Sequence, residues 1–185
     1  MTGRVAITRA LLPALRRGRE RVINIGAVSG RATAPFFGPP AVASAAFAAL
    51  SDAMRMEFAP FGVLVSPIEP GAIRTEIFNK LARTFDGDLL EQPKHLAQAY
   101  RPAILAAREA RSRSGADVPR VVVEAIMSAL NARGRPPART LVGKGSAKIA
   151  MVGLLPTGLR DNLLMSLLGL SKPMAAVAQS LGARA

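Results

Sequence analysis

The hydrophobic pattern of the chain alternates between helical and strand-like segments. Apolar residues at helical spacing predict a helix over residues 5–16, and small residues at the same spacing predict a tightly packed helix over residues 41–58. Two short runs rich in β-branched residues, 21–28 and 62–68, are bounded by turn glycines and predict strands. Helices that alternate with strands are typical of a parallel sheet covered on both faces, so the pattern predicts an α/β fold.

The second half of the chain continues this pattern after a polar interruption. Residues 76–116 are polar and predict a lid-like region beside a substrate site. Asp117 is expected to cap a helix that has Pro119 in its first turn and runs to Asn131. Residues 139–143 then predict a final edge strand.

Residues 149–185 form an apolar C-terminal extension. Pro156, Arg160 and Asp161 interrupt it, so it lacks the roughly twenty uninterrupted apolar residues that a membrane span needs. Residues 163–170 are compatible with peripheral contact at a membrane surface or with a cover over a lipophilic pocket. Packing in the protein core is the favoured interpretation of this segment.

Length and residue usage narrow the function classes. The chain has 185 residues, half of them hydrophobic, which predicts a single domain over residues 1–185 with a substantial core. It contains no cysteine, which excludes disulfides, thiol nucleophiles and thiolate metal sites. His95 is the only histidine, and its partner at helical spacing, Glu91, predicts a surface contact rather than catalysis. No segment reads as a signal peptide, so a cytoplasmic location is expected.

The formal net charge of +13 indicates an affinity for anions. Basic residues cluster at Arg16, Arg17 and Arg19 and again in residues 133–139. Such clusters can hold a phosphate backbone or an anionic membrane surface. Aromatic residues make up 4% of the chain and tryptophan is absent, which argues against nucleic acid as the partner because single-strand recognition depends on aromatic stacking.

Three segments resemble the short-chain dehydrogenase/reductase family. They are RVINIGAVSG at residues 21–30, FGVLVSPIEPGAIRT at residues 61–75, and the opening MTGRVAITRALLPALRRG, which is similar to the family's dimerisation helix. The resemblance covers at least residues 2–142. It implies the C-terminal part of a Rossmann-like doubly wound parallel sheet, strands five to seven of the family, without the N-terminal strands that bind the nucleotide.

The resemblance also implies a cofactor and a substrate class. Family members use NAD or NADP, and IEPGAIRTEIF is similar to members acting on retinoids, steroids and other lipophilic alcohols or ketones. Binding of either cofactor by this chain is in question, because no G-x-G-x-x-G follows a strand. Gly143-Lys144-Gly145 is the nearest phosphate-site candidate, but it lacks the third glycine at the required spacing.

The family's catalytic positions carry different residues here. The family's helix opens with Tyr-x-x-x-Lys, and Pro40 and Ser44 occupy those two positions. Ala27, thirteen residues before Pro40, stands at the position of the substrate-binding serine. The fourth catalytic residue, an asparagine, falls just outside the chain, before Met1. Proline has no side-chain proton to transfer, and serine supplies no positive charge, so the resemblance implies no intact catalytic set.

One cofactor motif of the family is retained. Residues 70–75, PGAIRT, match the family's Pro-Gly-x-x-x-Thr, whose backbone and threonine contact the nicotinamide carboxamide. The resemblance therefore implies that Pro70, Gly71, Ile73 and Thr75 are cofactor-binding residues.

Three functions are compatible with these observations. The first is a catalytically inactive family relative that pairs through the helices of residues 2–17 and 41–58 with itself or with an intact homologue. The unpaired edge expected along residues 22–27 also predicts that the chain is not a stable monomer. The second is an active NAD(P)-dependent dehydrogenase whose start lies upstream, with Ser29 or Tyr100 replacing the tyrosine. The third is a basic protein that binds membrane or nucleic-acid surfaces.

Overall fold

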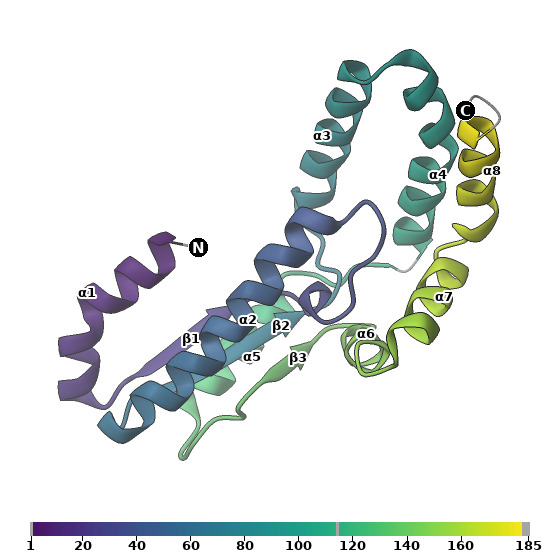
Figure 1. Ribbon diagram of the computed structural model, residues 1–185. Helices are drawn as coiled ribbons and strands as arrows, with labels where there is room; N and C mark the ends of the chain where they lie inside the picture. Colours follow the sequence, from purple (N-terminus) through teal and green to yellow (C-terminus); the bar gives the residue numbers. More distant parts are fainter. Residues whose placement is uncertain (1, 114, 183–185) are drawn as a thin grey trace. The chain divides into compact units, whose positions relative to one another are not determined.

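The computed structural model describes residues 2–113 and 115–182, which form two compact units (Figure 1). The first unit comprises the chain up to Thr33 together with Phe37–Ile73 and Asp117–Leu154. The second comprises Ala34–Phe36, Arg74–Ala116 and the chain from Leu155 onward. The expectation of one domain over residues 1–185 stays a prediction.

A parallel sheet organises the first unit. Its strands lie in the order β1 (Arg21–Ile25), β2 (Leu64–Pro70) and β3 (Thr140–Val142). Arg21 pairs with Leu64 at one end of the first ladder, and Ile68 pairs with Thr140 where the second ladder begins. The predicted α/β class, the parallel pairing and the terminal position of β3 are confirmed, although β3 is shorter than the predicted residues 139–143.

Helices cover both faces of this sheet. Figure 1 shows α2 in front of the strands and α5 behind them. Six of the seven residues of β2 are buried, as expected for a strand covered on both sides. The helical elements of the first unit are α1 (Thr2–Gly18), η1 (Val28–Gly30), α2 (Gly38–Phe58), η2 (Ala59–Phe61), α5 (Arg120–Asn131) and α6 (Ser146–Val152).

The core of the first unit lies between α2 and the sheet. Met54 and Phe58 of α2 pack with Val63 and with Val65 of β2. The partly buried side chains that complete this cluster are Leu12, Leu15, Val22 and Leu50. Leu12 and Leu15 belong to α1, so one stripe of that helix faces the core while Ile7 and Leu11 are exposed.

Several predicted element boundaries in the first unit were wrong. The strand expected over residues 62–68 is Leu64–Pro70, and the helix expected over residues 5–16 is Thr2–Gly18. The strand expected over residues 21–28 ends at Ile25, and the chain enters η1 at Val28 after the extended Ala27. The helix expected to begin at residue 41 begins at Gly38, since prolines are tolerated in a first helical turn, where backbone N–H groups have no helical partner. Pro40 therefore lies inside the helix.

Asp117 does not cap the helix that follows it, contrary to the prediction. Helix α5 begins at Arg120 after Pro119, without a side-chain cap. The Asp117 backbone N–H donates to the carbonyl oxygen of Ala72 at 3.0 Å, and its carboxylate accepts the backbone N–H of Lys144. Asp117 thus fixes two loops instead of a helix end.

The second unit is helical. The segment predicted as a polar lid-like region contains two helices. The helical pattern was not recognised from the sequence, because the buried positions of the second of these helices are mostly alanines, which form only a weak apolar stripe. Arg108 joins these two helices by donating to the Ala82 carbonyl oxygen at 2.9 Å and to the Asp86 carboxylate at 2.8 Å.

Burial and the neighbouring Arg108 lower the pKa of Arg111 below its ordinary value. The unit's helices are α3 (Ile77–Glu91), α4 (Lys94–Arg113), α7 (Thr157–Leu167) and α8 (Ser171–Gly182).

The apolar C-terminal region packs partly into the core of the second unit. Leu170 is fully buried with Ala103, Ala107 and Val177, whereas Leu167 is 66% exposed. Across the described residues, no helix is long and apolar enough to cross a membrane. Pro156 separates α6 from α7, which explains why the apolar run does not form one helix.

Among the described residues, neither edge of the sheet has a further strand beside it. Among the described residues, β1 pairs with β2 alone, and its other edge is free. That the chain represents strands five to seven of a larger sheet stays a prediction.

Candidate functional site

The candidate site lies at the carboxyl ends of β1 and β2, where open parallel sheets bind their ligands. The chain leaves β1 through Gly26, whose backbone N–H donates to the Ile68 carbonyl oxygen at 2.9 Å. Ala27 follows in extended conformation, half-buried, with a methyl group where the resemblance implies a hydroxyl. This position therefore offers no side-chain hydrogen bond to a substrate.

The first turns of α2 carry Pro40 and Ser44, for which the resemblance implies the tyrosine and lysine positions. Pro40 is half-buried in the first turn, and Ser44 is half-buried one turn later. The Ser44 hydroxyl donates to the Pro40 carbonyl oxygen at 2.8 Å. This hydroxyl is therefore engaged by the helix backbone, and no phenol or ammonium group stands at either position.

Gly30 holds the β1 turn against α2. A Cβ atom on Gly30 would lie 2.6 Å from the Ala45 nitrogen and 2.8 Å from the Ser44 carbonyl carbon. Both atoms belong to the backbone, so they cannot move aside as a flexible side chain would. The turn that follows Ala27 thus packs directly on the helix segment that carries Ser44.

The two substitute candidates lie in different units. The Ser29 hydroxyl is buried and has no hydrogen-bond partner in the described part of the chain. Tyr100 packs against the buried apolar cluster of the second unit. The structure gives no distance that would join them in one site.

The retained motif after β2 is held by its own neighbours. The Gly71 N–H donates to the Val142 carbonyl oxygen at 2.8 Å, and a Cβ on Gly71 would lie 2.9 Å from the Lys144 carbonyl oxygen. Ile73 forms an isolated parallel bridge with Asp117. Pro70 is buried at the end of β2. These contacts fix the turn but occupy the Gly71 N–H.

Thr75, the last residue of that motif, belongs to the second unit. Its hydroxyl oxygen accepts the backbone N–H of Ile77 at 3.4 Å, at the start of α3. Thr75 is exposed and lies two residues before the start of α3.

The candidate phosphate turn at residues 143–145 already carries a carboxylate. Gly143 and Gly145 adopt positive φ of 82° and 76°, which glycine tolerates. The Lys144 N–H between them donates to the Asp117 carboxylate. A phosphate at this turn would meet like charge, so the turn serves to join α6 to the sheet.

Sequence reasoning missed a buried charge network beside the candidate site. Glu69, 2% exposed and next to Pro70, accepts the Arg31 Nε–H at 2.6 Å and also a hydrogen bond from Arg139. Arg139 donates in turn to the Asp52 carboxylate at 2.5 Å. A buried carboxylate needs such partners, since an unpaired charge away from water is costly. No local pattern reveals this network, because Arg31 and Arg139 lie far from Glu69 along the chain.

The described residues contain no group of three or more histidine and carboxylate side chains that could hold a metal ion. His95 is exposed on α4, whereas Glu91 is the last residue of α3, so the two do not lie on one helix as their predicted contact assumed.

Comparison with known proteins is consistent with this arrangement. Residues 1–85 match the family model described as short chain dehydrogenase. The chain is 33% identical over 172 residues to rabbit (Oryctolagus cuniculus) 11-beta-hydroxysteroid dehydrogenase type 2, covering 89% of this chain and 42% of that protein. It is 46% identical over 77 residues to mouse (Mus musculus) retinol dehydrogenase 5, covering 42% and 24%. The chain thus spans less than half the length of either curated relative.

Solved structures show the same fold. A short chain dehydrogenase from Burkholderia cenocepacia in complex with NADP superposes with a TM-score of 0.63 at 21% identity, covering 89% of this chain and 55% of that one. A short-chain dehydrogenase from Streptomyces avermitilis superposes with a TM-score of 0.57 at 25% identity, covering 93% and 58%. The structures show the fold, whereas the family-model match over residues 1–85 and the identity to curated relatives show that the chain belongs to the short-chain dehydrogenase/reductase family and is similar to its retinol and hydroxysteroid dehydrogenases.

Proposed function

We propose that this chain is a non-catalytic member of its family, which acts as a subunit paired with a second copy of itself or with an intact homologue. The observation that carries the proposal is the hydrogen bond from the Ser44 hydroxyl to the Pro40 carbonyl oxygen. In the family, the residue at the position of Ser44 supplies an ammonium group. In this chain the Ser44 hydroxyl instead bonds to the backbone of its own helix. The position of the acid–base phenol is a proline ring within the same turn.

The residues present do not fit a nicotinamide cofactor poised for hydride transfer. Ala27, Pro40 and Ser44 supply no group that could give a proton to a carbonyl oxygen or take one from an alcohol. The Gly71 N–H is already bonded to Val142. Removing a positioned general acid or base costs about 10²–10⁴ in rate, and the effects of cooperating groups do not simply add. We therefore derive no reaction step through NAD or NADP.

The purified chain is expected to oxidise neither retinol nor hydroxysteroids with NAD or NADP. Steady-state production of the reduced cofactor, followed by absorbance, tests this expectation. The reason is the absence of an acid–base group at Pro40. Ser29→Ala and Tyr100→Phe serve as the matched variants. If turnover occurs and either substitution abolishes it, the chain is an active dehydrogenase with a substitute residue, and our proposal is wrong.

Exposed apolar side chains support pairing through α1 and α2. Ile7 and Leu11 of α1 are 63% and 53% exposed and lie one helical turn apart. Val42 and Met56 of α2 are 69% and 63% exposed, at a spacing that returns to the same face of the helix. The exposed Ala45 and Ala49 lie between them on that face and would allow close helix approach.

Charging the exposed face of α2 is expected to separate the paired subunits. Val42→Glu with Met56→Glu would place carboxylates in a desolvated contact, raising the dissociation constant about tenfold or more. Sedimentation equilibrium at micromolar concentration measures the change. Leu90→Glu, at a residue of α3 that is 87% exposed, is the control and should leave association unchanged. A wild-type chain that is monomeric at these concentrations refutes self-pairing, and failure to co-purify with any family dehydrogenase refutes pairing with a homologue.

A further inference from the structure

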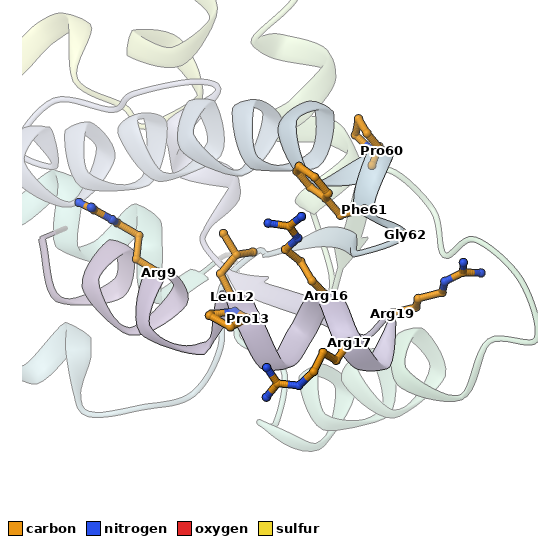
Figure 2. Close-up of a pocket in the computed structure, with 10 residues that line it drawn as sticks. Arg9, Leu12, Pro13, Arg16, Arg17, Arg19, Pro60, Phe61 and Gly62 are labelled. Atoms are coloured by element: carbon orange, nitrogen blue, oxygen red, sulfur yellow. The ribbon is translucent and has the colours of Figure 1, made fainter.

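A cavity of about 860 Å³ lies in the first unit, between the C-terminal half of α1 and the η2–Gly62 turn. Figure 2 shows the Arg16 side chain beside the Phe61 ring, whereas Arg9, Arg17 and Arg19, which also line the cavity, extend in different directions. It is separate from the candidate site at the carboxyl ends of β1 and β2, because Gly62 precedes the amino end of β2.

The cavity has an unbalanced positive charge. Its lining includes Arg9, Arg16, Arg17 and Arg19 and contains no acidic residue. In the part of the chain that the structure describes, none of these four guanidinium groups forms a salt bridge. Glu20, which follows Arg19 in sequence, is exposed and does not line the cavity. Four uncompensated cations around one cavity favour an anionic ligand.

Arg19 and Gly62, both with positive φ, face each other at the rim of the cavity. Arg19 has φ of 51°, a left-handed conformation that non-glycine residues adopt with difficulty. Gly62 opposite has φ of 75°, and a Cβ on it would lie 3.2 Å from Cγ of Arg19. Both residues end helical segments, since the Glu20 N–H donates to the Leu15 carbonyl oxygen at 3.0 Å and the Val63 N–H donates to the Phe58 carbonyl oxygen at 3.3 Å. The missing Gly62 side chain leaves the space that the Arg19 stem uses.

An apolar wall faces the arginines. The Arg16 guanidinium lies 3.8 Å from the centroid of the Phe61 ring, a stacking contact that holds its plane. Pro60 lies next to Phe61 in sequence, and Leu12 and Pro13 of α1 add apolar surface to the lining of the cavity. A ligand of this cavity can therefore place a charged group on the guanidinium groups and an apolar group on the wall.

We propose that this cavity binds the phosphate group of an organic phosphate whose apolar part rests on Phe61. A guanidinium offers paired N–H donors that match two phosphate oxygens, and several guanidinium groups together neutralise a doubly charged phosphate. The proposal does not depend on whether the chain is catalytic. The phosphate could come from a free small molecule or from an anionic lipid headgroup, and the two sources are separated below.

Isothermal titration calorimetry of the full chain with phenyl phosphate and with inorganic phosphate tests the proposal. We expect one saturable site per chain, with phenyl phosphate binding more tightly than inorganic phosphate. Phe61→Leu should remove most of that difference while leaving inorganic phosphate binding in place. Binding that is absent or does not saturate would overturn the proposal.

Charge-matched variants distinguish a site from general attraction to a basic protein. Arg16→Gln with Arg17→Gln should weaken phenyl phosphate binding about tenfold or more, because charge-assisted hydrogen bonds are lost. Arg133→Gln with Arg135→Gln removes the same charge from an exposed loop and should change binding less than twofold. Arg17→Gln alone keeps the Arg16–Phe61 contact and should still weaken binding. Equal losses in the two double variants would overturn the proposal.

Co-sedimentation with vesicles identifies the source of the phosphate. Vesicles of phosphatidylcholine with phosphatidic acid are compared with vesicles of phosphatidylcholine alone. Capture that needs phosphatidic acid, and that the Arg16/Arg17 double variant loses while the loop variant retains it, supports a lipid headgroup. Saturable phenyl phosphate binding without vesicle capture supports a free organic phosphate. Capture that both double variants lose equally contradicts a specific site.

Discussion

Replacing Glu69 by glutamine is expected to lower the free energy of unfolding by about 3 kcal/mol, near the lower end of values for breaking a buried ion pair. The Glu69 side chain is 2% exposed, while those of Arg31 and Arg139 are 30% and 20% exposed. Glutamine keeps the shape but removes the charge that both arginines face. Their partial exposure to water moderates the cost, which explains why we expect the lower end.

Chemical denaturation followed by far-ultraviolet circular dichroism measures this effect. Glu124→Gln is the matched control, because Glu124 pairs with Arg120 at 2.9 Å on the exposed surface of α5. Exposed pairs of this kind contribute about 0–1 kcal/mol. A Glu69→Gln variant as stable as the Glu124→Gln variant would show that the buried network does not stabilise the fold.

Replacing Gly30 by alanine is expected to lower the free energy of unfolding by about 2 kcal/mol, within the range for overpacking a well-packed site. The added Cβ would meet the Ala45 nitrogen at 2.6 Å and the Ser44 carbonyl carbon at 2.8 Å. Since these are backbone atoms, either α2 or the β1 turn must shift. The substitution would therefore disturb the contact between the turn that follows β1 and the N-terminal part of α2.

Gly38→Ala provides the comparison for this second effect. A Cβ on Gly38 would have no heavy atom within 4 Å, and the residue lies at the start of the same helix. We expect its unfolding midpoint to stay close to that of the unsubstituted chain. Equal midpoints for Gly30→Ala and Gly38→Ala would mean that the turn does not pack against α2 as the structure shows.

Local sequence patterns were sufficient to predict the sheet and its covering helices. The β-branched run that includes Val22 and Ile25 and the small-residue helix ending at Phe58 carry their periodicity within one element. Their ends were less predictable. The apolar run continues past Gly26 to Val28, whereas β1 ends at Ile25 and Val28 begins η1.

The features that escaped prediction depend on contacts between distant residues. Glu69 lies 38 residues from Arg31 and 70 from Arg139, so nothing beside it in sequence reveals its burial. Asp117 has the residue type and position of a helix cap, yet it bonds instead to Ala72 and Lys144. A local rule identified a capping residue, but tertiary contacts determined its role.

The candidate site shows the same division. The assignment of Ala27, Pro40 and Ser44 to the family's catalytic positions stays a prediction from short, continuous motifs. That the Ser44 hydroxyl bonds to the Pro40 carbonyl, and that the Ser29 hydroxyl is buried without a partner among the described residues, required coordinates. The arginine cavity also required them, since Phe61 and Arg16 come from separate elements.

The most direct test of catalytic inactivity is transfer of an isotopic label. The chain would be incubated for many hours with retinal or a ketosteroid and with NADH or NADPH that carries deuterium at the transferring carbon. Mass spectrometry would then search for deuterium in the alcohol product. We predict no label above that in a reaction without protein. Deuterated alcohol formed in proportion to protein concentration would show that the chain transfers hydride despite Pro40 and Ser44, and would contradict its assignment as a non-catalytic member of the family.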